Sequence, residues 1–204
     1  MMDFTVLKRL DVETPLGVVH LVCFDKSGVQ HRQVILRVLS EVAGRTLVPR
    51  DIVQTKDCPR PAFPGLDFDV NWTHSGDICV LAYGSPEGGG VCRLKIGVDC
   101  EIHKPKRLKI AEHFYSPQEV AHIRALAPEA AETEFFRLWC RKEALYKCVG
   151  GPFFEGSLRR SMLVDSLPLE QGRTVYFCDV NLPEDFLCEF ADSPKVSLCV
   201  AVCR

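Results

Sequence analysis

The strongest constraint on the fold is a long segment with helical spacing at residues 132–148, which is followed by Gly150-Gly151. Its apolar residues recur with the period of an amphipathic helix. Three nearby residues can supply the buried side of that helix: Leu138, Leu145 and Val149. Such a face needs a complementary apolar surface, so the segment predicts a long helix packed on a sheet.

Apolar runs typical of strands lie on both sides of this helix. Strands are predicted at 17–24, 78–83, 94–100, 174–180, 186–191 and 196–203, and further helices at 29–43 and 116–127. Gly44 is the expected end of the first helix. Ser116-Pro117 and Glu119 form an expected capping box at the start of the second.

This order of elements predicts an α/β (α+β) protein. We expect two similar lobes in a pseudo-twofold arrangement, each a small sheet packed by a long helix. A boundary near residue 94 gives the lobes 1–93 and 94–204, with the functional site at their interface.

Composition excludes several classes of protein. The chain has 204 residues and a net charge of -2, so it lacks the basic excess of a bulk nucleic-acid binder. No apolar run is long enough to span a membrane, and the N-terminus has no continuous apolar stretch typical of a secretory signal. We therefore expect no nucleic-acid partner, no membrane association and a cytoplasmic location, with an organellar address left open.

The chain contains eleven cysteines, none of them in a CxxC pair. Most lie within apolar runs, where a free thiol behaves as a small buried hydrophobic group. This placement predicts core cysteines in a reducing compartment. A metal or redox site at Cys199 and Cys203 is the minor alternative.

Two carboxylates stand at the end of the strand predicted at 94–100, in the sequence IGVDCEIHKPKR. Asp99 and Glu101 are two positions apart, and side chains two apart on a strand share a face. Paired carboxylates provide the hard oxygen ligands that Mg²⁺ uses together with phosphates. A solvated strand end without a metal is the alternative.

The predicted helix at 132–148 carries a second set of candidates. Trp139, Glu143 and Lys147 are spaced four residues apart and form one stripe, with Lys142 beside it. The simple alternative is an exposed Glu143–Lys147 ion pair, worth only a few tenths of a kcal/mol. A tryptophan that flanks the charges instead of lying in the core favours a functional stripe.

Basic residues provide candidate contacts for anions. His74 lies between two hydroxyl residues in VNWTHSGD at 70–77, which we interpret as a turn and a candidate phosphate pocket; a structural histidine is the alternative. Arg32 and Arg60 can bind phosphate oxygens bidentately, with plain surface positions as the alternative. A basic run predicts a solvated face or a patch that steers an acidic partner: Lys104, Lys106, Arg107 and Lys109.

Together, the order and spacing of these segments resemble the motif set of the 4′-phosphopantetheinyl transferase superfamily, in particular its monomeric Sfp-like type. The matching segments read THS at 73–75, GVDCE at 97–101 and WCRKEALYK at 139–147, followed by Gly150-Gly151. FYSPQE at 114–119 is also similar to a family segment. The strong match runs from about residue 56 to residue 151.

The resemblance implies a role for each candidate residue. Asp99, Glu101 and Glu143 would bind Mg²⁺ against the pyrophosphate of coenzyme A, and Glu143 would also be the base for a carrier serine. Lys147 would be the second catalytic residue and would pair with the pyrophosphate. The other expected contacts with coenzyme A are His74 and Arg32 at a phosphate, Arg60 beside the adenine, and Thr73.

The implied activity is holo-[acyl-carrier-protein] synthase activity. A carrier serine would attack the β-phosphorus of coenzyme A and release adenosine 3′,5′-bisphosphate. The expected partner is an apo acyl carrier protein or carrier domain of fatty acid, polyketide, peptide or lysine-pathway synthesis, docked near 114–126. The protein is expected to be a monomer. The chain departs from the family pattern where Pro59 replaces a glycine and Thr73 a serine, and where the segment before Arg32 is short.

Two other functions stay open at this point. One is another Mg²⁺-dependent nucleotide transferase or nuclease that uses the same carboxylates, although no GxxxxGK[ST] P-loop is present. The other is a catalytically silent coenzyme A-binding scaffold. The intact set of three carboxylates argues against the silent scaffold.

Overall fold

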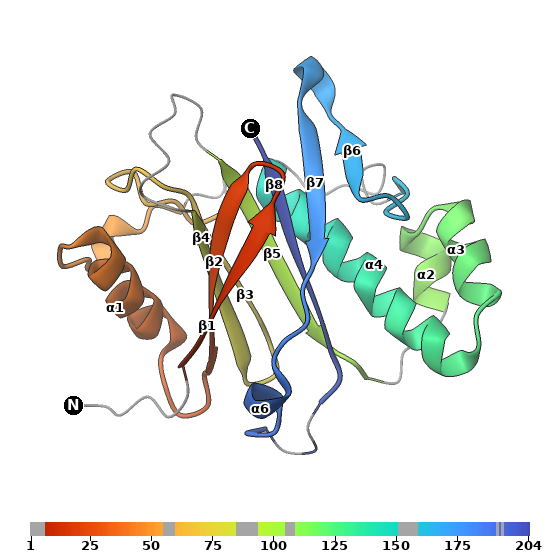
Figure 1. Cartoon of the computed structure of the whole chain (residues 1–204), viewed down its shortest axis with the longest axis horizontal. Helices are drawn as coiled ribbons and strands as arrows, with labels where there is room; N and C mark the ends of the chain where they lie inside the picture. The colour runs from red at the N-terminus through yellow and green to blue at the C-terminus, as the bar shows by residue number, and fades with distance from the viewer. Residues whose placement is uncertain are drawn as a thin grey trace.

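The computed structural model of the chain describes residues 7–54, 60–84, 94–104, 109–150, 159–190, 192 and 194–204. Its first sheet has four antiparallel strands in the order β1-β2-β4-β3. These strands are β1 (Leu7–Thr14), β2 (Gly17–Asp25), β3 (Val70–Ser75) and β4 (Ile78–Gly84). Helix α1 (His31–Ala43) covers one face of this sheet with its buried apolar side (Figure 1).

The second sheet is also four-stranded and antiparallel, with the order β5-β8-β7-β6. Its strands are β5 (Lys95–Ile102), β6 (Ser166–Pro168), β7 (Thr174–Asp179) and β8 (Val196–Cys203). The long helix α4 (Pro128–Val149) lies along the face formed by β5 and β8. Short helical elements complete the described chain: Pro49–Asp51, α2 (Lys109–Phe114), α3 (Pro117–Arg124), Glu170–Gly172 and α6 (Glu184–Leu187).

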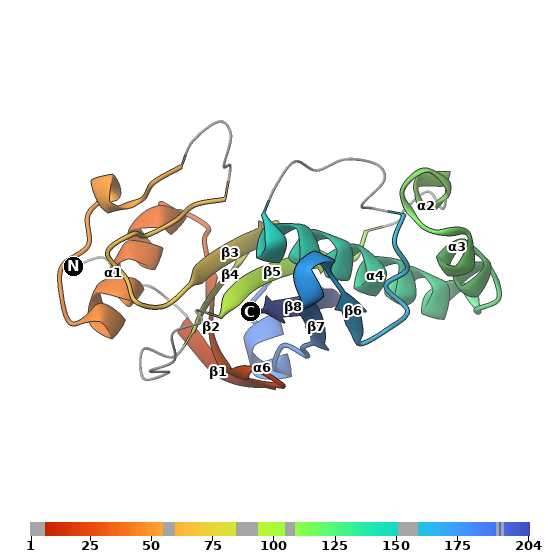
Figure 2. The same ribbon diagram turned by 90° about the horizontal axis from the view of Figure 1, so that it is seen from above.

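The two sheets pack against each other, and the two long helices cover their outer faces (Figure 2). This layering follows from the alternation of side chains along each strand. On β5, Ile96, Val98 and Cys100 enter the apolar core between the sheets. The intervening positions 97, 99 and 101 therefore face α4, which places the two predicted carboxylates of this strand beneath the helix.

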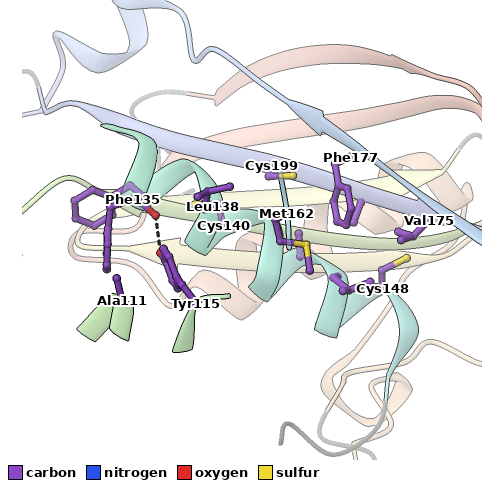
Figure 3. Packing of buried hydrophobic residues seen from close by; sticks show 14 of the residues in the cluster. Ala111, Tyr115, Phe135, Leu138, Cys140, Cys148, Met162, Val175, Phe177 and Cys199 are labelled. Carbon is purple, nitrogen blue, oxygen red and sulfur yellow. Dashed lines mark hydrogen bonds between the residues drawn. The ribbon is translucent and has the colours of Figure 1, made fainter. Parts of the chain in front are cut away.

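Small side chains allow α4 to approach the second sheet closely. Cys140, Ala144 and Cys148 recur at every fourth residue of the helix and are buried. They join one cluster with Cys199 and other small residues of β8 (Figure 3). The nine cysteines in the described ranges are free thiols, and most are buried, as the sequence predicts.

Gly97 of β5 lies where the strand and α4 are in close contact. A Cβ atom at this position would lie 2.0 Å from the carbonyl oxygen of Ala144 and 2.5 Å from the amide nitrogen of Cys148. Both atoms belong to the helix backbone, so neither can rotate away. We expect Gly97→Ala to lower the free energy of unfolding in urea by about 3 kcal/mol.

Gly84→Ala is the matched control for this change. A Cβ at Gly84 would make only ordinary contacts, the nearest at 3.7 Å. We expect its free energy of unfolding to change by less than about 1 kcal/mol. Equal losses in the two variants would contradict the close approach of α4 to β5.

The structure confirms the predicted fold class and several element boundaries. Gly44 ends α1 in the left-handed conformation, with a φ of 63°. Ser116 and Glu119 form the predicted capping box of α3. The strands of the first sheet fall within 1–93 and those of the second within 94–204, but the sheets share a core. The division into two domains therefore stays a prediction.

Other predictions from the sequence are wrong. The expected strand at 186–191 is replaced by α6, whose Phe186 packs into the core between the sheets. The expected turn at 70–77 is confined to Gly76 and Asp77, because the residues up to Ser75 form strand β3, whose alternating polar side chains line a seam with β5. Val149, expected to be buried, is 37% exposed at the end of α4. The described helices include none long and apolar enough to cross a membrane.

Candidate functional site

The edge strands β3 and β5 of the two sheets run side by side, joined by side chains. Polar residues at alternate positions near and along β3 accept hydrogen bonds from β5 backbone amides. The pairs are Ile96 N to Asp69 Oδ2 at 2.8 Å, Val98 N to Asn71 Oδ1 at 3.0 Å, and Ile102 N to Ser75 Oγ at 3.0 Å. We call this row the polar seam; it satisfies edge amides that would otherwise lack partners.

Asp99 is a buried carboxylate beside the polar seam, with 5% of its surface exposed. Its Oδ1 accepts hydrogen bonds from Lys147 Nζ at 2.7 Å and from Thr73 Oγ1 at 3.0 Å. Its Oδ2 is buried and has no hydrogen-bond partner among the described residues. Burial raises the pKa of Asp99, and the neighbouring Lys147 ammonium opposes this shift.

Glu143 stands on α4 one helical turn before Lys147 and is partly buried. Burial raises the pKa of Glu143 to about 7; the charges of Asp99 and Glu101 add to the shift, and Lys147 opposes it. Glu101 accepts a hydrogen bond from Ser75 Oγ at 3.0 Å. The structure therefore brings the three predicted carboxylates close enough together to repel one another.

Lys147 connects α4 with both edge strands. Besides its bond to Asp99, its Nζ donates to the carbonyl oxygen of Val98 and to Thr73 Oγ1, both at 3.2 Å. The side chain is 24% exposed. An exposed Glu143–Lys147 pair does not describe this arrangement, because the lysine is held by Asp99 of the strand.

The donor set fits a hard divalent cation such as Mg²⁺. Asp99 and Glu101 lie near enough to Glu143 to raise its pKa, and a buried oxygen of Asp99 lacks a partner in the described chain. The described residues contain no cluster of three or more ligand side chains already gathered for a metal. A closed cage is not required, because Mg²⁺ keeps several waters and binds through one or two carboxylates plus substrate phosphates.

A group of basic side chains lies on the other face of β3. His74 is exposed, and its ring centroid is 5.7 Å from that of His31, the first residue of α1. Burial lowers the pKa of His31, and the neighbouring charges of His74, Arg32 and Lys26 lower it further. We call these four residues the histidine cluster. Sequence reasoning missed His31, although its place at the start of the helix that carries Arg32 was a signal.

Arg60 lies at the end of the polar seam. It forms an ion pair with Asp69 and donates to the carbonyl oxygen of Ile96 at 2.7 Å. Its side chain is 13% exposed. The structure thus places Arg60 as a link between the two sheets, and a contact with adenine stays a prediction.

Two residues of α4 near the candidate site contact the short helices before it. Lys142 is buried in an ion pair with Glu119, with Nζ and Oε2 2.8 Å apart. Trp139 is partly buried and packs against Phe114 and Tyr115. Several residues of the sequence-based predictions lie outside the described ranges: Pro59, Lys106, Arg107 and Gly151.

Comparison with known proteins identifies the family of the chain. The sequence model of a family described as the 4′-phosphopantetheinyl transferase superfamily matches residues 95–195. The 4′-phosphopantetheinyl transferase AcpT of Salmonella typhi is 31% identical over 144 residues, which cover 67% of this chain and 71% of that protein. The chain belongs to the 4′-phosphopantetheinyl transferase superfamily.

Two further relatives match the chain over shorter segments. A 4′-phosphopantetheinyl transferase of Bacillus subtilis is 34% identical over 90 residues, or 44% of the chain and 36% of the relative. The 4′-phosphopantetheinyl transferase psf-1 of Bacillus pumilus is 39% identical over 83 residues, or 41% and 32%. The matched segments thus span about a third of the length of these two relatives. Within the superfamily match lie Asp99, Glu101, Glu143 and Lys147, whereas Arg32 and His74 lie outside it.

Proposed function

We propose that the protein is a Mg²⁺-dependent 4′-phosphopantetheinyl transferase with holo-[acyl-carrier-protein] synthase activity. It transfers the phosphopantetheine arm of coenzyme A to a serine of an apo carrier protein. The observation that carries the proposal is the Asp99–Lys147 pair beside Glu101 and Glu143, in a chain of this superfamily. Opposite charges held at one place suit a phosphoryl-type transfer, where catalysis consists mainly of positioning and charge stabilisation.

In the proposed reaction, the acidic residues bind the metal and the basic residue contacts the pyrophosphate. Asp99, Glu101 and Glu143 hold Mg²⁺, which supplies Lewis-acid stabilisation of the pyrophosphate. Lys147 provides a second, fixed positive charge for a pyrophosphate oxygen. The serine oxygen forms a bond to the β-phosphorus while the bond from that phosphorus to the leaving adenosine 3′,5′-bisphosphate breaks.

Glu143 is the proposed acceptor of the serine proton. It is partly exposed, so a carrier serine can reach its carboxylate oxygens, and proximity to the serine compensates for the weak basicity of a metal-bound glutamate. Asp99 is more deeply buried and already accepts two hydrogen bonds on one oxygen. The geometry therefore favours Glu143 over Asp99 as the base.

The histidine cluster is the proposed site for a phosphate of coenzyme A remote from the chemistry. Alanine in place of His74 or His31 should raise the KM for coenzyme A about 10-fold, with a smaller effect on kcat, because the contact is made equally in ground and transition states. The exposed neighbour Gln33 gives the control Gln33→Ala, which should leave KM unchanged. Steady-state kinetics with coenzyme A and dephospho-coenzyme A measure this. Equal use of both substrates by the native protein would exclude the assignment.

Incubation with coenzyme A, Mg²⁺ and an apo acyl carrier protein tests the proposed function. The carrier should gain the mass of one phosphopantetheine arm, and excess chelator should prevent the gain. A silent scaffold would bind coenzyme A without modifying the carrier, and another nucleotide transferase would leave the carrier unmodified while it used a different substrate.

Free thiols support a reducing compartment such as the cytoplasm. One chain supplies both strands of the seam, which supports action as a monomer.

A further inference from the structure

Two hydroxyl groups on β3 match two carboxylates on β5 across the polar seam. Thr73 Oγ1 donates to Asp99 Oδ1 at 3.0 Å, and Ser75 Oγ donates to Glu101 Oε2 at 3.0 Å. The two hydroxyl residues are two positions apart on β3, and the two carboxylate residues are two positions apart on β5. The two hydrogen bonds are therefore successive cross-links between the strands. Both hydroxyl residues are buried, with exposed fractions of 6% and 9%.

The spacing of these cross-links is fixed by the rest of the polar seam. Asp69, Asn71 and Ser75 each bond a β5 amide that lies 27 residues further along the chain. A constant separation means that β3 and β5 keep one register, and a slip by one residue would turn the hydroxyls to the opposite face. Thr73 departs from the row, since its hydroxyl bonds a carboxylate and Lys147 in place of a backbone amide.

At Asp99, the Thr73 hydroxyl bears on which carboxylate oxygen stays available. At Asp99, both Thr73 and Lys147 bond Oδ1, so Oδ2 is the oxygen left without a partner in the described chain. At Glu101, Ser75 donates to Oε2 while the same hydroxyl accepts from the amide of Ile102. A hydroxyl can donate and accept at once, so these two bonds are compatible.

We propose that Thr73 and Ser75 are positioning residues that orient Asp99 and Glu101 as metal ligands from the other sheet. The inference rests on the proposed function and extends it. Partners that hold a metal-binding carboxylate are worth about 10- to 100-fold in metal affinity. Here those partners stand on the first sheet while the ligands stand on the second, so the metal site depends on the seam between them.

Mn²⁺ binding to the full-length protein, measured by electron paramagnetic resonance, tests the proposal without an activity assay. Thr73→Val removes the hydroxyl but keeps the shape, and we expect it to weaken Mn²⁺ binding about 10-fold. Thr73→Ser restores the hydroxyl and should bind Mn²⁺ within about 3-fold of the native protein. Ser75→Ala should also weaken binding, and it provides a second test if Thr73→Val fails to fold.

Asn71→Ala separates orientation of the ligands from general loosening of the seam. Asn71 accepts a hydrogen bond from the amide of Val98 in the same row, and this contact is to backbone and not to a carboxylate. We expect it to lower thermal stability while leaving Mn²⁺ affinity near the native value. An equal loss of affinity in Asn71→Ala and Thr73→Val would overturn the proposal, as would equal affinities in Thr73→Val and the native protein, or no Mn²⁺ binding by the native protein.

Failure of the positioning role can be distinguished from failure of the proposed transferase activity. If the native protein modifies a carrier but the hydroxyl variants bind Mn²⁺ normally, the positioning role is wrong and the transferase activity stands. If the native protein modifies no carrier but Thr73→Val loses Mn²⁺ and Thr73→Ser regains it, the positioning role stands and the transferase activity is wrong.

Discussion

Glu143→Gln should lower kcat for carrier modification by at least about 100-fold, even at saturating Mg²⁺. Glutamine keeps the shape of the side chain and one ligand oxygen, but it cannot accept the serine proton. Coenzyme A should still bind, because Lys147 and the other carboxylates are unchanged. Steady-state kinetics over a range of Mg²⁺ concentrations, together with calorimetric titration of coenzyme A, measure the two effects separately.

The control for this variant is Glu129→Gln on the same helix. Glu129 pairs with Lys195 at the exposed start of α4, and its side chain is 80% exposed. We expect native kinetics from this control. Recovery of most of kcat in Glu143→Gln at high Mg²⁺ would show that Glu143 is only a ligand and that another group accepts the proton.

The same variant should stabilise the metal-free protein above neutral pH. The pKa of Glu143 is about 7 in the folded chain against an ordinary value of 4.5. The folded state holds the Glu143 proton more tightly than the unfolded state does. The protonated Glu143 therefore contributes stability that is fully present below about pH 4.5 and is lost as the pH rises through about 7. At about pH 8, Glu143→Gln should therefore raise the free energy of unfolding by on the order of 1 kcal/mol. No gain in urea titrations would contradict the burial and repulsion assigned to this carboxylate.

Asp99→Asn should reduce kcat/KM by at least about 100-fold, and added Mg²⁺ should not restore it. The amide is nearly isosteric, but it removes the charge that Lys147 pairs with and that a cation would bind. Thermal denaturation should show a folded protein, since the partly exposed Lys147 can turn toward water.

Asp165→Asn is the control for the same chemical change. Asp165 pairs with Arg141, and its side chain is 92% exposed. We expect it to retain native activity. Full activity of Asp99→Asn in the presence of Mg²⁺ would remove Asp99 from the proposed metal site.

Local periodicity is enough to predict half of the candidate site. Alternation along a strand places Asp99 and Glu101 on one face, and helical spacing places Glu143 and Lys147 one turn apart. Both expectations depend only on neighbours within a few residues. The structure adds that the strand face and the helix face meet, with Lys147 bonded to Asp99.

The other half depends on contacts between segments far apart in sequence. Thr73 and Ser75 meet carboxylates 26 residues further along the chain, and no local pattern indicates which strand will lie beside β5. The sequence at 70–77 predicts a turn around His74, whereas in the structure the alternating polar side chains of β3 bond to β5. Arg60 likewise suggests a free phosphate-binding group until Asp69 is seen to pair with it.

The mass of a carrier protein tests the central claim most directly. An apo acyl carrier protein is incubated with coenzyme A, Mg²⁺ and either the native protein or Asp99→Asn, and its intact mass is then measured. The account predicts that the native protein adds one phosphopantetheine arm to the carrier serine, that the variant adds almost none, and that chelation prevents the reaction. An unmodified mass across acyl, peptidyl and polyketide carriers, with a folded native protein and Mg²⁺ present, would contradict the proposed function.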